Sequence, residues 1–167
     1  MKKLTAILLT SLTILALAGC GNGKDSEASN EGETSKYTDA LEVLNTVLEV
    51  YTDDQRFAIA GGDSDNMTMD GPGKFDVTKT DQLDYTLGLP ADQAAVIDDA
   101  ASMLHMMNAN TFTGAAYHLT EGTDINAFAE AVKTNILARQ WVCGFPDTLL
   151  IIDVDGRYVI TAFGQAE

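Results

Sequence analysis

Three aspartates stand close together in a stretch rich in glycine and turn-forming residues. The stretch begins at residue 61, reads GGDSDNMTMDGPG, and contains Asp63, Asp65 and Asp70. Carboxylate oxygens are the hard ligands that Ca²⁺ prefers. The spacing departs from the EF-hand loop, because Met67 stands at its fifth position and no glutamate stands at its twelfth. We therefore expect a solvated acidic loop here, with a ligand or metal site at the three aspartates as the alternative.

One thiol and two imidazoles are further candidates for chemistry. They are Cys143, His105 and His118. A Cys–His nucleophile pair or a zinc site would need them to converge, but their spacing matches no metal signature and they fall on separate predicted elements. The sequence also contains no glycine-rich phosphate loop, nucleophile elbow or zincin motif. We therefore expect no catalytic residue, no bound metal and no cofactor.

A second cysteine lies where an apolar segment meets a polar one. Two lysines follow Met1, residues 4–18 carry no charge, and the chain reaches LAGC at residues 17–20. A basic start, a short apolar run and small residues before a cut site are typical of a secretory signal peptide. LAGC resembles the bacterial lipobox, which implies removal of residues 1–19 and a diacylglyceryl group on Cys20. The alternative is an ordinary signal peptide that leaves Cys20 as a thiol.

The chain after Cys20 divides by composition. Residues 20–35 are rich in Gly, Ser, Asn, Glu and Asp and have almost no apolar side chain to bury, so we expect a flexible tether. Residues 36–167 are long enough for one globular domain. If Cys20 carries lipid, no second cysteine is left to pair with Cys143, and the domain must fold without a disulfide.

The charge of the chain is strongly negative. Lys and Arg number 10 against 25 Asp and Glu, a net charge of -15. Loss of residues 1–19 removes two lysines, and 8 minus 25 gives -17. Such a chain repels phosphate backbones, so we expect no nucleic-acid partner. Membrane attachment would rest on the lipid of Cys20 and not on a polybasic patch.

Hydrophobic spacing predicts the elements of the domain. We expect a helix from Asp39 to about Thr52, an irregular loop at 61–80, a second helix at 91–108, a strand at 111–119, a third helix at 124–141, and a C-terminal hairpin. The hairpin signal is Asp155-Gly156 between two apolar, β-rich runs. Residues 57–60 fit a short strand or a helix end. The order indicates an α+β domain, with helices packed on one face of a small antiparallel sheet.

Methionines 103, 106 and 107 would share one side of the second predicted helix. Met side chains at helical spacing usually pack in a core, and the alternative is an adaptable groove for a partner.

Three further stretches carry a resemblance to a family. DDAASMLHMMNANTFTGAAYHL, ILARQWVCGFPDTLLI and YVITAFG together resemble small lipoproteins of gut Firmicutes that are labelled bacteriocin transport accessory proteins. The resemblance covers about residue 39 to the C-terminus. It implies help to a peptide exporter at the outer face of the cytoplasmic membrane, and it names no active residue.

These observations lead to one main expectation about function. We expect a lipid-anchored, extracytoplasmic bacterial domain that is not an enzyme and that binds a protein or peptide, such as a membrane export protein or its cargo. The alternative is a small-ligand or metal-binding lipoprotein that uses the loop at 61–80.

Overall fold

The computed structural model describes residues 35–106, 112–140 and 145–165 of the chain. These residues lie within one compact unit, Thr34–Glu167. The predicted signal peptide, Cys20 and the predicted tether up to residue 34 lie outside the described residues, as do Met107 and Cys143. Within the described ranges, each helix is too short or too polar to cross a bilayer.

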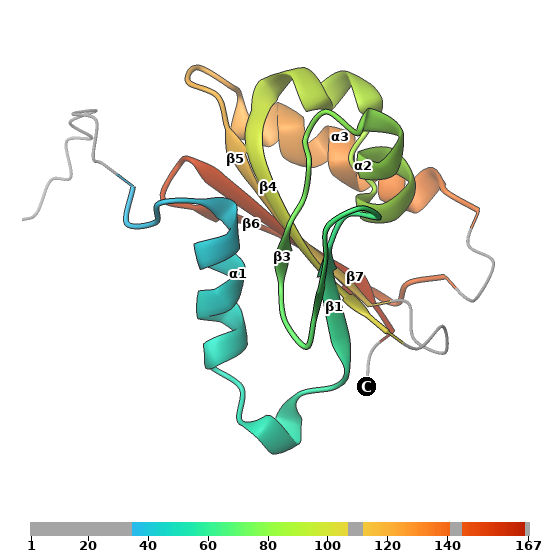
Figure 1. Cartoon of the computed structure of the whole chain (residues 1–167). Helices are drawn as coiled ribbons and strands as arrows, with labels where there is room; N and C mark the ends of the chain where they lie inside the picture. The colour runs from blue at the N-terminus through green and yellow to red at the C-terminus, as the bar shows by residue number, and fades with distance from the viewer. Residues whose placement is uncertain (1–34, 107–111, 141–144, 166–167) are drawn as a thin grey trace, which may run out of the picture. The chain divides into compact units, whose positions relative to one another are not determined.

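Helices and strands alternate irregularly along the described chain (Figure 1). The helices are α1 (Ala40–Glu49), α2 (Thr80–Leu87) and α3 (Ile125–Ala138), with short 3-10 helices η1 (Asp53–Gln55) and η2 (Ala91–Val96). The strands are β1 (Ile59–Gly62), β2 (Met67–Met69), β3 (Gly73–Lys74), β4 (Ile97–His105), β5 (Thr113–Leu119), β6 (Thr148–Val154) and β7 (Tyr158–Gly164).

The strands form one antiparallel sheet. Its order is β2-β1-β4-β5-β7-β6, and every recorded pairing is antiparallel. The short strand β3 pairs with β4 on the edge that β1 also uses, next to the β1 pairing. Strands β2 and β6 therefore stand at the two ends of the sheet. The predicted α+β class, antiparallel sheet and C-terminal hairpin are confirmed.

The helices cover both faces of the sheet, whereas the sequence predicted them on one face. Helix α1 packs on one face through Ala40, Val43 and Leu44, against residues such as Ala116 of β5. Helices α2 and α3 pack on the opposite face, where Tyr117 points. Successive strand residues face opposite sides of a sheet. Both faces of the central strands β4 and β5 are consequently buried.

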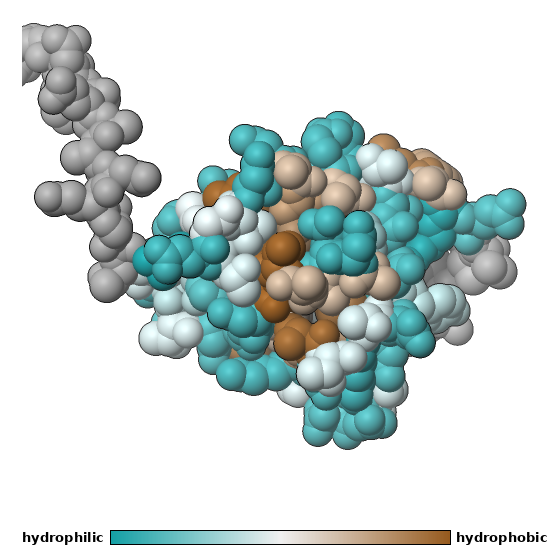
Figure 2. Space-filling view, turned by 90° about the horizontal axis from the view of Figure 1, so that it is seen from above, coloured by the Kyte–Doolittle hydropathy of each residue, from teal (hydrophilic) through white to brown (hydrophobic). Residues whose placement is uncertain are grey.

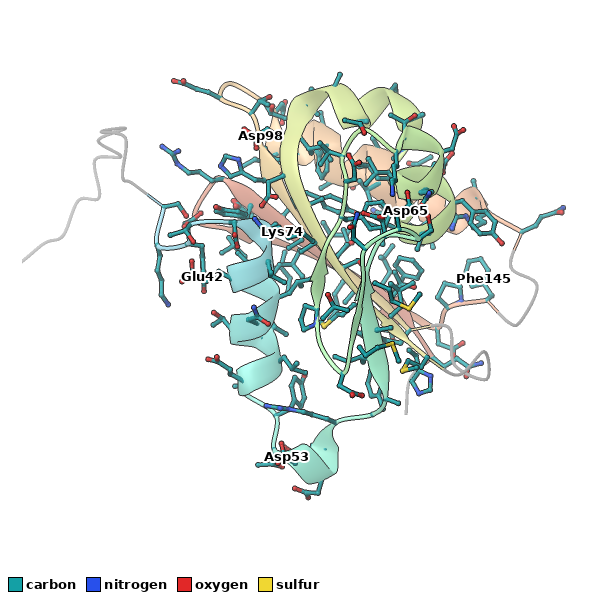
Figure 3. The ribbon with its side chains drawn as sticks, in the orientation of Figure 1. Glu42, Asp53, Asp65, Lys74, Asp98 and Phe145 are labelled. Carbon is teal, nitrogen blue, oxygen red and sulfur yellow. The ribbon has the colours of Figure 1, made fainter. Side chains whose placement is uncertain are left out.

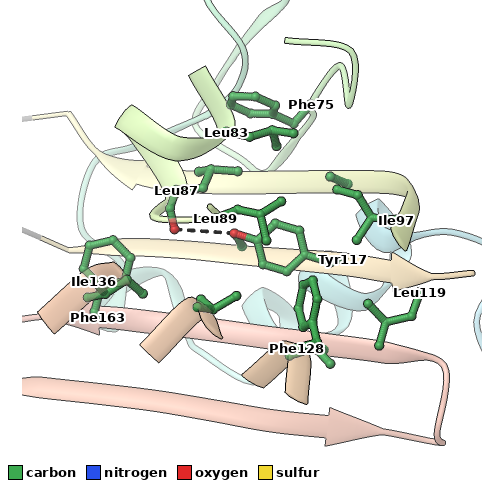
Figure 4. Close-up of a cluster of buried hydrophobic side chains, with 14 residues drawn as sticks. Phe75, Leu83, Leu87, Leu89, Ile97, Tyr117, Leu119, Phe128, Ile136 and Phe163 are labelled. Carbon is green, nitrogen blue, oxygen red and sulfur yellow. Dashed lines mark hydrogen bonds between the residues drawn. The ribbon is translucent and has the colours of Figure 1, made fainter. Parts of the chain in front are cut away.

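The larger core lies between the sheet and helices α2 and α3 (Figure 4). Tyr117 is fully buried at its centre, and its ring meets that of Phe128 edge-on at 5.7 Å. Its hydroxyl donates to the carbonyl oxygen of Leu87 at 3.4 Å, which gives the buried polar atom a partner. Burial raises the pKa of Tyr117 above its usual range, so the phenol stays protonated and keeps donating.

Local sequence signals explain where the longer helices begin. Asp39 accepts a hydrogen bond from the amide of Glu42 and caps α1, as predicted. Asp124 accepts from the amides of Asn126 and Ala127 and caps α3. The third predicted helix is thus confirmed, with its end at Ala138.

The second predicted helix is wrong over most of its length. Only η2 follows Pro90, and residues 97–105 form strand β4. A strand buried on both faces lacks the alternation of apolar and polar residues that marks a strand. Ala and Met also favour helices, so the apolar residues at 97–105 predicted a helix. Met103 is therefore buried in a strand, while Met106 is 44 % exposed beyond its end.

The predicted irregular loop at 61–80 is also more ordered than expected. It contains strands β2 and β3, and β1 settles the assignment of residues 57–60 in favour of a strand. Gly61 of β1 lies directly against the backbone of β3 and β4, because a Cβ there would lie 2.1 Å from the nitrogen of Gly73 and 2.4 Å from the carbonyl oxygen of Ser102. The sequence predicted a loop here because it is rich in turn-forming residues, and it gave no sign of this close contact between backbones.

The C-terminal hairpin is confirmed. Asp155 and Gly156 have φ angles of 52° and 71°, the positive values that the two central residues of a type I′ turn adopt. The amide of Arg157 donates to the carbonyl oxygen of Val154 and closes the turn.

Candidate functional site

The acidic stretch places Asp63 and Asp65 around one lysine. Lys79 Nζ donates to a carboxylate oxygen of Asp63 and, at 2.7 Å, to one of Asp65. Asp70 lies apart from them, at the end of the β2 hairpin with a φ of 60°. Figure 3 shows Asp65 beside α2. The ammonium group thus occupies the position between carboxylates where the sequence suggested a cation.

Asp63 is almost fully buried, and its charge is compensated from several sides. Its carboxylate accepts from the amides of Asp65 and Asp76 at 2.9 and 3.1 Å, as well as from Lys79. Burial alone would raise the pKa of Asp63, but the hydrogen bond from Lys79 and those from the amides outweigh it and hold the pKa far below its usual range. An aspartate that stays charged at neutral pH therefore ties the loop to the start of α2.

A small pocket lies beside this cluster. Its volume is about 240 Å³, and it is lined mostly by apolar atoms of residues that include Gly61, Gly62, Met67, Phe75 and Leu104, with Asp63, Ser64 and Gln82 as polar neighbours. Among the described residues, no group of three His, Cys, Asp or Glu side chains is placed to hold a metal ion.

The two histidines lie near opposite ends of β4. His118 stands opposite Asp99, and His105 is six residues further along that strand, roughly 20 Å away at the usual rise per residue. The ring of His105 stacks on that of Phe57 at 4.9 Å. Cys143 lies outside the described residues. The structure therefore does not bring the two imidazoles together.

A β-bulge in β4 builds a second, polar pocket. The register shifts between Ile97 and Asp99, so one extra residue, Asp98, enters the strand. Because of this extra residue, Ile97 and Ala100 both face the α2–α3 core. Asp98 and Asp99 both line a pocket of about 480 Å³ on the other face. This pocket could not be predicted from the sequence, because residues 97–105 have the apolar spacing of a helix.

Polar contacts in and around this pocket hold residues 35–40 against the sheet. Asp99 accepts a 2.7 Å hydrogen bond from the amide of Ala40 at the start of α1. Lys74 pairs with the cap residue Asp39 at 3.0 Å, near the N-terminal end of α1 in Figure 3. Asp155 accepts from Ser35 Oγ at 2.6 Å. These contacts connect residues 35–40 with three separate strands or turns.

His118 and Asp98 share a hydrogen bond in the same pocket. A His–carboxylate pair is the arrangement of a general base, but a base needs a hydroxyl or water to act on. Ser35 Oγ already donates to Asp155, and the hydroxyl of Tyr158 donates to the carbonyl oxygen of Tyr37. Burial and the nearby carboxylates raise the pKa of Tyr158, which keeps it a donor. The hydroxyl groups of Ser35 and Tyr158 thus have hydrogen-bond partners other than the His118–Asp98 pair.

On β6 and β7, the face of the sheet that α1 covers elsewhere is apolar and open. On β6, Leu150 and Ile152 are 51 % and 48 % exposed. They stand opposite Ala162 and Ile160 of β7, which are half-buried on the face that α1 covers elsewhere. We call these four residues the β6–β7 face. Covering either of the two exposed side chains would contribute about 1 kcal/mol.

Figure 2 views the molecule from another side, where most of the surface is hydrophilic and apolar residues gather near the centre. Phe145, which precedes β6, is 53 % exposed and stands out from the fold in Figure 3. Single exposed apolar residues are common on soluble domains, whereas adjacent ones on a strand at the edge of a sheet indicate an interaction surface.

Comparison with known protein families, with curated proteins and with solved structures found no match for this chain.

Proposed function

We propose that this chain is a lipid-anchored bacterial domain, held at the extracytoplasmic face of the cell membrane, that binds a protein or peptide and catalyses no reaction. The anchor is the diacylglyceryl group on Cys20, as its signal-peptide context predicts. The resemblance to bacteriocin transport accessory proteins suggests that the partner belongs to a peptide exporter or is its cargo.

The exposed β6–β7 face is the observation that carries this proposal. Leu150 and Ile152 keep about half of their surface in water, although the same chain buries Phe163 on the neighbouring strand almost completely. An apolar strip that costs stability in water is retained most readily when a partner covers it.

The polar groups of the domain favour binding over catalysis. Asp63 is neutralised by Lys79, and the His118–Asp98 pair lies beside hydroxyl groups that already have hydrogen-bond partners. Ser35 Oγ donates to Asp155 and the hydroxyl of Tyr158 donates to the carbonyl oxygen of Tyr37, so neither hydroxyl is paired with the imidazole of His118.

A binding site for a small ligand at residues 61–80 is the second candidate. The pocket of about 240 Å³ beside Asp63 favours it. A metal ion there would have to displace the ammonium group of Lys79 from Asp63 and Asp65. Calorimetric titration of Ca²⁺ into the full chain tests the metal form, and heat that saturates at micromolar Ca²⁺ would favour it over the peptide-binding proposal.

Site-specific photocrosslinking in native membranes tests the main proposal. A photoreactive residue at position 150 should capture one abundant partner, identified by mass spectrometry as an exported peptide or an exporter subunit. The matched control carries the same residue at position 69 of β2, where Met69 is 53 % exposed on the opposite end strand. Equal, scattered products from both positions would contradict the proposal.

A further inference from the structure

We infer that β6 accepts an extended peptide segment as an additional antiparallel or parallel strand, and that this segment alternates apolar residues between basic ends. The inference rests on the proposed function, since it names the partner's chemistry and the mode of binding at the same face. Strand addition uses main-chain hydrogen bonds for affinity and alternate side chains for specificity.

The position of β6 in the sheet leaves one of its edges open. Strand β6 is the last in the order and pairs with β7 alone among the described strands. It has seven residues, whereas β2 at the other end has three. Short end strands are one device by which proteins protect an edge against pairing. Of the two ends of the sheet, β6 offers the longer template for a new strand.

Alternate side chains of β6 are half-buried against the core on one face of the sheet and exposed on the other. Leu149 and Ile151 are half-buried against the core beneath α3. Leu150 and Ile152 point to the other face and stay exposed, because α1 packs over β4 and β5. A strand added beside β6 would continue both rows. Apolar residues on one side of the added strand would then extend the β6–β7 face.

Carboxylates stand near both ends of β6. Asp147 precedes the strand, and Asp153 and Asp155 lie at its other end. The basic neighbours there are Arg157 and Lys36, whose amide donates to Asp155. All five residues are exposed. The net charge of the whole chain, -15, has the same sign as these carboxylates. Lysine or arginine at the ends of an added segment would meet opposite charges.

The same charges argue against a second copy of the chain as the occupant. Two β6 strands paired about a two-fold axis would run antiparallel. Asp147 of one copy would then come near the Asp153–Asp155 end of the other. Like charges in such positions destabilise strand pairing.

The experiment uses the full chain in a neutral detergent and a fluorescent peptide of alternating Val and Thr with two lysines at each end. Binding is measured by fluorescence anisotropy, and hydrogen exchange followed by mass spectrometry locates it. We expect saturable binding and slower exchange of β6 amides. One control peptide has a proline at its centre, which removes a main-chain donor, and the other has glutamates in place of the terminal lysines. Each should bind at least about tenfold more weakly than the test peptide. Equal binding of the proline peptide would overturn strand addition.

A matched pair of variants tests the location. Leu150→Lys places a like charge on the β6–β7 face and should weaken binding of the lysine-ended peptide at least about tenfold. Met69→Lys makes the same change on β2, at nearly the same exposure (53 % against 51 %), and should leave affinity within about twofold. Equal losses in both variants would show attraction by overall charge and overturn the inference.

The two proposals fail in different ways. Suppose that position 150 captures an export partner, but the peptide does not bind or the hydrogen exchange of β6 amides does not change. Strand addition would then be overturned, and the binding function would remain supported. Loss of position-dependent capture in membranes would overturn the binding function itself.

Discussion

The contact between Asp63 and Lys79 decides how the acidic stretch is held. The side chain of Asp63 is 1 % exposed and that of Lys79 is 19 % exposed. Lys79→Met would leave the buried carboxylate without its cation, and we expect a loss of about 3 kcal/mol in the free energy of unfolding. Lys133→Met is the control, because its pair with Glu130 is exposed and should contribute less than about 0.5 kcal/mol. Urea denaturation measures both, and equal losses would contradict this role of Lys79.

The same carboxylate should make stability depend on pH. The pKa of Asp63 is lower in the folded chain than in the unfolded chain, so its contribution is present above about pH 4. It is lost as the pH falls further toward the folded-state value. In urea denaturation, Asp63→Asn should therefore be less stable than the wild type at pH 7, and the difference should shrink below pH 4. A difference that stays constant down to about pH 2.5 would contradict this assignment.

At the scale of elements, the crossing of β1, β3 and β4 depends on glycine. A Cβ on Gly61 would lie 2.1 Å from the nitrogen of Gly73 and 2.4 Å from the carbonyl oxygen of Ser102. Because both are backbone atoms, they cannot move aside independently of the sheet. Gly61→Ala should destabilise the fold by at least about 2 kcal/mol. Gly71→Ala, in the connection between β2 and β3, meets no atom within 4 Å and should be nearly neutral in thermal denaturation.

Elements with a local signal could be predicted from the sequence. Asp39 and Asp124 sit where their side chains cap helices, and Asp155-Gly156 adopts the φ angles that its turn requires. Strand β4 could not be predicted in this way. Its burial on both faces follows from α1 packing on one side and α2 and α3 on the other. That is a property of the whole sheet and leaves no period-2 pattern.

The candidate site was less predictable than the elements. The sequence singled out Asp63 and Asp65, but the importance of Lys79 emerges only when the chain folds back on itself. The polar pocket depends on a bulge at Asp98, which shifts by one residue the face that each side chain points to. The β6–β7 face is open because α1 is placed over other strands. Each feature results from packing between segments distant in sequence.

At the scale of the whole molecule, the first described residues are held beside the C-terminal hairpin. Ser35 and the amide of Lys36 both donate to Asp155, at the turn that joins β6 to β7. The domain therefore begins next to one end of the strand proposed to bind a partner. An anchor on Cys20 would hold that strand within the reach of the intervening residues, roughly 20 Å for a flexible tether.

The chain offers its own control for a test of the anchor, because it has two cysteines. Cys20→Ala removes the thiol that would carry diacylglycerol, and two or three acyl chains are what makes such attachment stable. We expect the wild type and Cys143→Ala in the membrane fraction, and Cys20→Ala in the soluble fraction or the medium. Immunoblotting of fractions at low and high salt measures this distribution. The chain is too acidic to be held at anionic lipids by charge. If Cys20→Ala stays in the membrane fraction at both salt concentrations, that result would contradict the lipid anchor. The uncut apolar segment or a membrane partner would then hold the protein at the membrane.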